Sequence, residues 1–183
     1  NKIRENIQKH ISDFFDPEMG VFVDCIVNGK RSKHASEHSN SVAILFGDIE
    51  KNQIKSVVKA YKEKPEIFGK ISPIWSFWLP ALVKAGEVDI AIDWIESRFG
   101  KLIKDNFSTI PETWSLYGEQ TTGVWRPRNS RAEVQSGGVW IISFLLQNIV
   151  GIMPYKPGFK EVLLNPCIGK LEKIDETMSL KEG

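Results

Sequence analysis

Residues 73–100 read PIWSFWLPALVKAGEVDIAIDWIESRFG, and this stretch decides the fold class. Its first half is an aromatic, apolar run that predicts a helix over 73–85. Its second half predicts an amphipathic helix over 88–99, because apolar residues recur there at helical spacing. Gly86 separates the two and is typical of a helix end. Two helices joined by so short a turn predict an antiparallel hairpin.

The rest of the chain follows the same pattern of helices that stop at glycine or proline. We expect Gly47 and Gly100 to end helices, and Pro80 to kink the middle of its helix. Further helices are expected over 2–15, 41–46, 48–62 and 135–150, the last so apolar that it should be buried. Short strands are expected over 21–27, 159–164 and 170–174, with a tight turn at 28–29. The sequence therefore predicts a mainly α protein built of helical hairpins, with a few short strands near the C-terminal end.

Composition sets limits on the function. The chain has 183 residues, 42% hydrophobic and 26% charged, which is ordinary for a globular domain. A formal charge of +1 gives no reason to expect binding to nucleic acid or to a membrane surface. The apolar runs are shorter than the about 20 residues of a membrane span. Cys25 and Cys167 are expected to be buried free thiols, and these, with an N-terminus that shows no signal segment, are compatible with a cytoplasmic location.

Common cofactor and metal motifs are missing from the sequence. We find no phosphate-binding loop, dinucleotide fingerprint or zinc pattern, so no cofactor is expected. His34 and His38 have the i, i+4 spacing of a helical metal site, but Ala35-Ser36 resembles a helix start and would leave His34 outside the helix. We therefore expect no metal site.

Glu112 is the carboxylate with the most suggestive surroundings. It lies between Pro111 and Trp114 in an irregular stretch, 108–132, of the length that is often functional in a compact domain. A glutamate against an apolar wall can acquire a raised pKa and activate a water as a general base. Alternatively, Pro111 and Glu112 simply form the first turn of a helix, where a carboxylate favours the helix dipole.

Five segments in chain order resemble the bacterial α-L-rhamnosidases of glycoside hydrolase family 78. The first resembles the S-x-H-A-N helix of that family, and the fourth, TIPETW, resembles its T-x-W-E-x-W motif. The last resembles the family's junction between a helical barrel and a C-terminal β-sandwich. The segments are 35–47, 78–86, 89–102, 109–114 and 149–171.

This resemblance implies a fold and an activity. It implies that 1–152 form the second half of an (α/α)6 catalytic barrel, and that 153–183 form the junction and the start of a truncated β-sandwich. It implies inverting hydrolysis of terminal α-L-rhamnosides, which needs two carboxyl groups about 6.5–9.5 Å apart. Glu112 matches the family's general base. The family's general acid lies in an earlier segment that this sequence does not match, so the chain alone should be inactive.

The resemblance also suggests which residues contact a carbohydrate substrate. The candidates are His38, Trp75, Trp78, Trp114 and Trp125. Trp75 and Trp78 lie three residues apart on a helix, so one or both could instead belong to the core. Trp94 and Trp140 are predicted to be core residues.

Two departures keep other functions open. Pro111 stands where the family often has Trp, and Gln135 stands where a histidine is common. A six-hairpin glycosidase with another sugar specificity, or a catalytically inactive carbohydrate-binding module, is therefore an alternative. Half a barrel would also leave apolar helix faces exposed, so homo-oligomers through these faces are expected.

Overall fold

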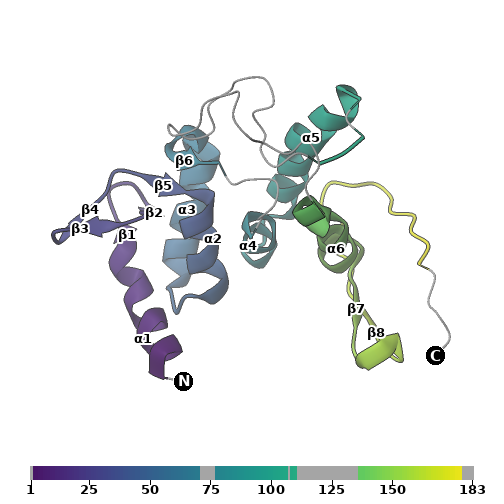
Figure 1. Cartoon of the computed structure of the whole chain (residues 1–183), viewed down its shortest axis with the longest axis horizontal. Coiled ribbons are helices and arrows are strands. Elements are labelled where there is room, and N and C mark those ends of the chain that lie inside the picture. Colours follow the sequence, from purple (N-terminus) through teal and green to yellow (C-terminus); the bar gives the residue numbers. More distant parts are fainter. Residues whose placement is uncertain (1, 71–76, 107, 111–135, 179–183) are drawn as a thin grey trace.

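The computed structural model describes residues 2–70, 77–106, 108–110 and 136–178, and it is mainly helical (Figure 1). The α-helices are α1 (Lys2–His10), α2 (Glu37–Phe46), α3 (Lys51–Glu63), α4 (Trp78–Lys84), α5 (Val88–Lys104) and α6 (Trp140–Phe144). Shorter helical turns are η1 (Ile11–Phe14), η2 (Pro65–Ile67), η3 (Ser136–Val139) and η5 (Pro157–Phe159), and η4 (Leu145–Val150) is a π-helical stretch that continues α6.

The strands of the described residues form four two-stranded pairs. Three are antiparallel: β1 (Phe15–Asp16) with β2 (Val21–Phe22), β3 (Ile26–Val27) with β4 (Lys30–Arg31), and β7 (Ile152–Pro154) with β8 (Val162–Leu164). The fourth is parallel, between β5 (Ala35–Ser36) and β6 (Phe68–Gly69). The turn predicted at 28–29 is confirmed: Asn28 and Gly29 both have positive φ, as a tight hairpin turn requires.

The core lies where α2, α3, α4 and α5 meet, and α2 packs directly against α4 (Figure 1). Each of these helices turns small and apolar side chains inward, which is the amphipathic pattern expected from the sequence. Fully buried members of this core include Ile44, Val57, Trp78, Leu79, Leu82 and Ala91. The hairpin predicted around Gly86 is present, with Gly86 at a φ of +85° between α4 and α5.

Two expectations about helix breakers were wrong. Gly100 does not end its helix, because α5 continues to Lys104 and buries Leu102 beyond the glycine. The cost of an interior glycine is only about 1 kcal/mol relative to alanine, and the burial of Leu102 can offset it. Pro80 does not kink a helix midpoint either: α4 begins at Trp78, so Pro80 lies in the first turn, where no backbone donor is needed.

The apolar stretch 135–150 is divided and only half buried. It forms η3, α6 and η4 over Ser136–Val150, and Gly151 ends it in the left-handed conformation, with a φ of +78°. Ile141, Phe144 and Ile149 face the core. Val139, Ile142 and Leu145 are exposed, Ile142 by 66%. The expectation of a wholly buried helix was therefore wrong, and one apolar face is left open.

The C-terminal part forms one hairpin and then returns to α5. The strand expected over 159–164 is shorter, at Val162–Leu164, and residues 170–174 form no strand. Instead, the backbone N–H of Lys170 donates to Asp89 of α5 over 2.6 Å, and its side chain contacts Asp93 and Glu96. The boundary predicted at residue 152, between the barrel part and the start of a β-sandwich, stays a prediction.

Two smaller findings concern the thiols and membranes. Cys25 is exposed and Cys167 is partly buried, so the expectation of two buried thiols was wrong for Cys25. Across the described ranges, no helix combines the length and the apolar character that a membrane crossing needs.

Candidate functional site

Only two of the six predicted site residues lie in the described part of the chain. Glu112, Trp75, Trp114 and Trp125 lie outside the described residues. His38 and Trp78 are described, on α2 and α4. The structure does not bring these two to one surface, because His38 is exposed and Trp78 is fully enclosed.

Trp78 lies in the centre of the core. Its exposed fraction is 0%, and its ring centroid lies 4.8 Å from that of Tyr61 and 5.9 Å from that of Phe68. Its buried Nε1 has no hydrogen-bond acceptor among the described residues. This position favours the packing role that the sequence left open for Trp78, and its sugar contact stays a prediction.

His38 owes its position to the start of α2. The helix start indicated at Ala35-Ser36 is confirmed, and α2 begins before the predicted residue 41. Ser36 is the N-cap in extended conformation, and its Oγ accepts from the backbone N–H of Ser39 over 3.1 Å. The Ser39 hydroxyl lies 3.3 Å from the Ser36 backbone N–H and accepts from it, which completes a reciprocal capping box. The box fixes Glu37 as the first helical residue, so His38 lies in the first turn of α2.

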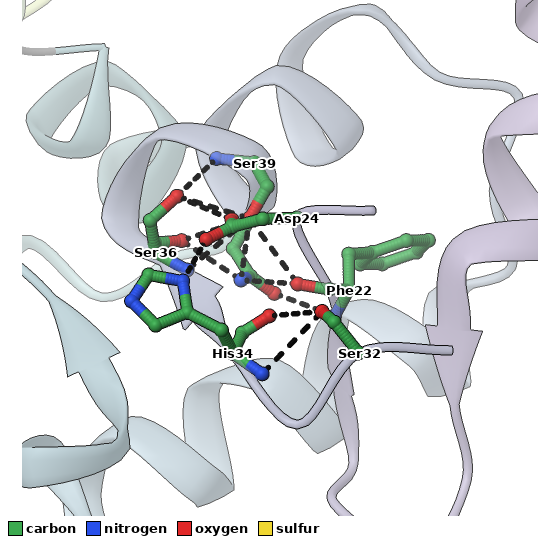
Figure 2. Close-up of polar contacts among 7 residues, drawn as sticks. Phe22, Asp24, Ser32, His34, Ser36 and Ser39 are labelled. Carbon is green, nitrogen blue, oxygen red and sulfur yellow. Dashed lines mark hydrogen bonds and ion pairs between the residues drawn. The ribbon is translucent and has the colours of Figure 1, made fainter. Parts of the chain in front are cut away.

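A polar network anchors the β3–β4 region to this helix start (Figure 2). The Ser36 hydroxyl donates to Asp24 Oδ1 over 2.7 Å, and His34 Nδ1 contacts the other oxygen of the same carboxyl group. The Ser32 hydroxyl donates to the His34 carbonyl over 3.0 Å. His34 lies before α2, as the sequence predicted, so His34 and His38 do not share a helix face.

Asn40 ties α2 to strand β2. Its Oδ1 accepts from the Phe22 backbone N–H and its Nδ2 donates to the Phe22 carbonyl, both over 2.9 Å. The Asn40 side chain is fully buried, and its amide pairs with both backbone groups of Phe22, as a neighbouring strand would. Asn40 belongs to the segment that resembles the family's S-x-H-A-N helix. Its structural role there is to join α2 to β2 by hydrogen bonds, which the sequence did not reveal.

A cavity opens beside His38. Its volume is about 320 Å³, and η1, β2 and the first turns of α2 enclose it. The His38 residue is exposed overall, but desolvation of its imidazole lowers the pKa, and the charges of Glu37 and Asp24 offset that effect only in part. The His38 imidazole is therefore neutral at pH 7 and can both donate and accept a hydrogen bond.

Glu37, next to His38, points the other way and is buried among three helices. Its Oε1 accepts from the Tyr61 hydroxyl and from Trp94 Nε1, each over 3.1 Å. Arg98 donates to both carboxylate oxygens, over 2.6 and 3.1 Å, and its guanidinium lies 4.0 Å from the centroid of the Trp94 ring. Burial, followed by the charge of Glu37, raises the pKa of Tyr61 far above its usual value of 10.0.

This cluster suits a structural role better than a catalytic one. The Glu37 side chain is 1% exposed, and its oxygens accept four hydrogen bonds from described residues, so it offers little surface to a substrate or a reacting water. The sequence analysis did not identify this cluster. The available signal was the i, i+4 spacing of Trp94 and Arg98, which places an aromatic ring and a cation on one face of α5. Trp94 is a core residue as predicted, and Trp140 is partly buried against Phe99 and Phe144.

The described residues do not by themselves assemble a metal site. No three histidine, cysteine, aspartate or glutamate side chains gather closely enough among them to hold an ion. Glu112 lies outside these residues.

The similarity of this chain to known proteins was found in comparison with solved structures. No family profile matches the sequence, and no curated protein matches it either. Among solved structures, the chain resembles the crystal structure of a glycoside hydrolase family 78 rhamnosidase from Bacillus sp. GL1, with a TM-score of 0.69 and 25% sequence identity. The match covers 88% of this chain and 17% of that chain, so this mainly helical protein resembles one part of the rhamnosidase.

Proposed function

We propose that this chain contributes part of the catalytic domain of an inverting glycoside hydrolase that acts on terminal α-L-rhamnosides. The observation that carries the proposal is the structural similarity over 88% of the chain to a family 78 rhamnosidase. The five sequence segments that resemble the family, in the family's order, support it independently of the coordinates. In this proposal the helical hairpins belong to an (α/α)6 barrel that other chain segments complete.

Glu112 is the proposed general base. In an inverting hydrolase the base removes a proton from a water that attacks the anomeric carbon, while an acid on the opposite side protonates the leaving oxygen. Trp114 beside it would supply an apolar wall, and such a wall favours a carboxyl pKa suited to that task. The acid would come from outside this chain.

A second candidate is a carbohydrate-binding module without catalysis. Gln135 favours it, because it stands where the family commonly has a histidine and so removes a titratable side chain. A six-hairpin hydrolase for another sugar is a variant of the first proposal.

The test compares the wild type with Glu112→Gln in the longer protein that supplies the rest of the barrel. The substrates are an aryl α-L-rhamnoside and a panel of other aryl glycosides. We expect the variant to lose about 10²–10⁴-fold in rate, the usual share of a positioned base, with substrate binding retained. Glu63→Gln, at an exposed glutamate near the end of α3, serves as a matched control and should retain full activity.

The outcomes separate the candidates. Activity on one sugar that Glu112→Gln removes identifies both the base and the substrate. Equal activity of the two proteins contradicts the assignment of Glu112. Saturable sugar binding with no hydrolysis of any substrate by the wild type favours the binding module.

A further inference from the structure

The cavity beside His38 has an apolar body and one polar edge. Its lining comes from three elements within the first 43 residues of the chain, namely η1, the β2 region and α2. Apolar walls surround most of it, and they are formed by Ile11, Phe14, Phe22, Val23, Val42 and Ala43. The polar groups are Asp24, His38 and Ser39.

The polar edge has hydrogen-bonding capacity left. Within the described part of the chain, the His38 imidazole makes no hydrogen bond, whereas Ser39 is occupied by the capping box. Asp24 accepts from Ser36 and contacts His34, and each carboxylate oxygen has a further lone pair. One ligand hydroxyl could therefore accept from His38 and donate to Asp24.

The apolar part continues beyond this cavity. A second cavity of about 560 Å³ lies between α1 and the C-terminal half of α2, and it shares Ile11 and Val42 with the first. Ile3, Ile7 and Phe46 give it further apolar lining, and Arg4 and Gln8 of α1 add polar groups to it. An elongated apolar group can therefore extend from the His38 end along α2.

We propose that this groove binds a small uncharged molecule with one hydroxyl group and an alkyl body, independently of the glycosidase function proposed above. The Asp24 carboxylate disfavours an anionic head group at the His38 end of the groove, and the one cationic side chain among the groove's lining residues, Arg4, lines the second cavity and not the first. A sugar fits poorly, because most of its hydroxyl groups would be buried against apolar walls without partners. The volume of the first cavity is at the lower end of the about 300–1,000 Å³ typical of ligand pockets.

The test is a titration of the 183-residue chain with 1-hexanol, followed by NMR of its histidine side chains. The chain has three histidines, and His10 and His34 do not line either cavity, so they act as internal controls. We expect a saturable shift of the His38 resonances alone. Hexanoate should bind at least tenfold more weakly than 1-hexanol, and each methylene added between 1-butanol and 1-hexanol should tighten binding about fourfold.

A variant locates the site. Val42 lines both cavities and is 40% exposed, so Val42→Trp should fill the groove without unfolding the chain and should weaken 1-hexanol binding at least tenfold. Val27→Trp, at another exposed valine on β3, is the control and should leave binding unchanged.

Three results would overturn the proposal. One is the lack of a saturable His38 shift in the wild-type chain. Another is hexanoate binding as tightly as 1-hexanol. The third is a larger His38 response to methyl α-L-rhamnoside than to 1-hexanol, which would assign the groove to the sugar instead.

Discussion

Arg98 of α5 and Glu37 of α2 form a two-point ion pair inside the helical core. Nη2 lies 2.6 Å from Oε1 and Nη1 lies 3.1 Å from Oε2, with the two side chains 14% and 1% exposed. Because Tyr61 of α3 donates to the same carboxylate, one buried charge connects three helices. Such a pair is costly to assemble but more costly to break, since removing one partner leaves a buried charge uncompensated.

The first prediction is that Glu37→Gln destabilises the chain by about 3–5 kcal/mol, the usual cost of breaking a buried pair. The amide keeps the shape of the side chain but removes the negative charge that faces Arg98 over 2.6 Å. Urea denaturation measures the loss of unfolding free energy. Glu63→Gln, which breaks an exposed i, i+4 pair with Lys59, is the matched control and should change stability by no more than about 0.5 kcal/mol.

A double variant tests the mechanism of that loss. Glu37→Gln combined with Arg98→Met removes both charges and should recover part of the stability lost in Glu37→Gln alone, since no isolated buried charge remains. If Glu37→Gln is no less stable than Glu63→Gln, the pair does not hold the helices together.

The second prediction concerns alkaline pH and Tyr61. Its folded-state pKa is raised above the unfolded value of 10.0, because burial and the Glu37 carboxylate both oppose a phenolate there. The native state therefore holds this proton more tightly than the unfolded state does. The resulting stability is complete below pH 10 and is lost progressively as the pH rises above it.

Phenolate absorbance distinguishes Tyr61 from the other tyrosines. In the folded chain at pH 11, Tyr61→Phe should leave the absorbance unchanged, because Tyr61 is still protonated. In urea at the same pH, the variant should absorb less than the wild type, since every tyrosine then titrates near its ordinary value. A smaller native-state signal in Tyr61→Phe would show that Tyr61 ionises normally.

The third prediction separates the two roles considered for Trp78. If its ring is a core residue, Trp78→Ala should cost about 3–5 kcal/mol of stability. Trp78→Phe keeps much of the aromatic packing against Tyr61 and should cost less. Phe46→Ala, at an exposed aromatic residue that packs on the Phe77 ring, is the control and should cost less than either.

Sugar binding completes the test of Trp78. The folded Trp78→Phe variant should bind any sugar ligand of the wild type with unchanged affinity, because the enclosed ring cannot reach it. A selective loss of sugar affinity with stability retained would instead restore Trp78 as a substrate contact.

Short-range signals predicted the elements better than the contacts between them. Asn28-Gly29, Gly86 and the Ser36 cap could each be inferred from the sequence, because a positive φ or a capping hydroxyl is a local requirement. The prediction that Gly100 ends its helix was wrong, since the tertiary burial of Leu102 outweighs the low helix propensity of glycine. The sequence did not single out Glu37, and only the tertiary structure reveals its partner Arg98, 61 residues away.

The last prediction concerns the open apolar face of the η3–α6–η4 segment. Val139, Ile142 and Leu145 are exposed there, and Ser136–Val150 contains no charged residue to discourage association. We therefore expect the isolated chain to self-associate as its concentration rises, as the sequence analysis also expected for unpaired helix faces. Ile142→Lys should shift the assembly toward monomer in light scattering, because a charge at a buried interface is costly. Val27→Lys, at an exposed valine on β3, should leave the assembly unchanged. A wild-type chain that stays monomeric throughout the concentration range would contradict self-association through this face.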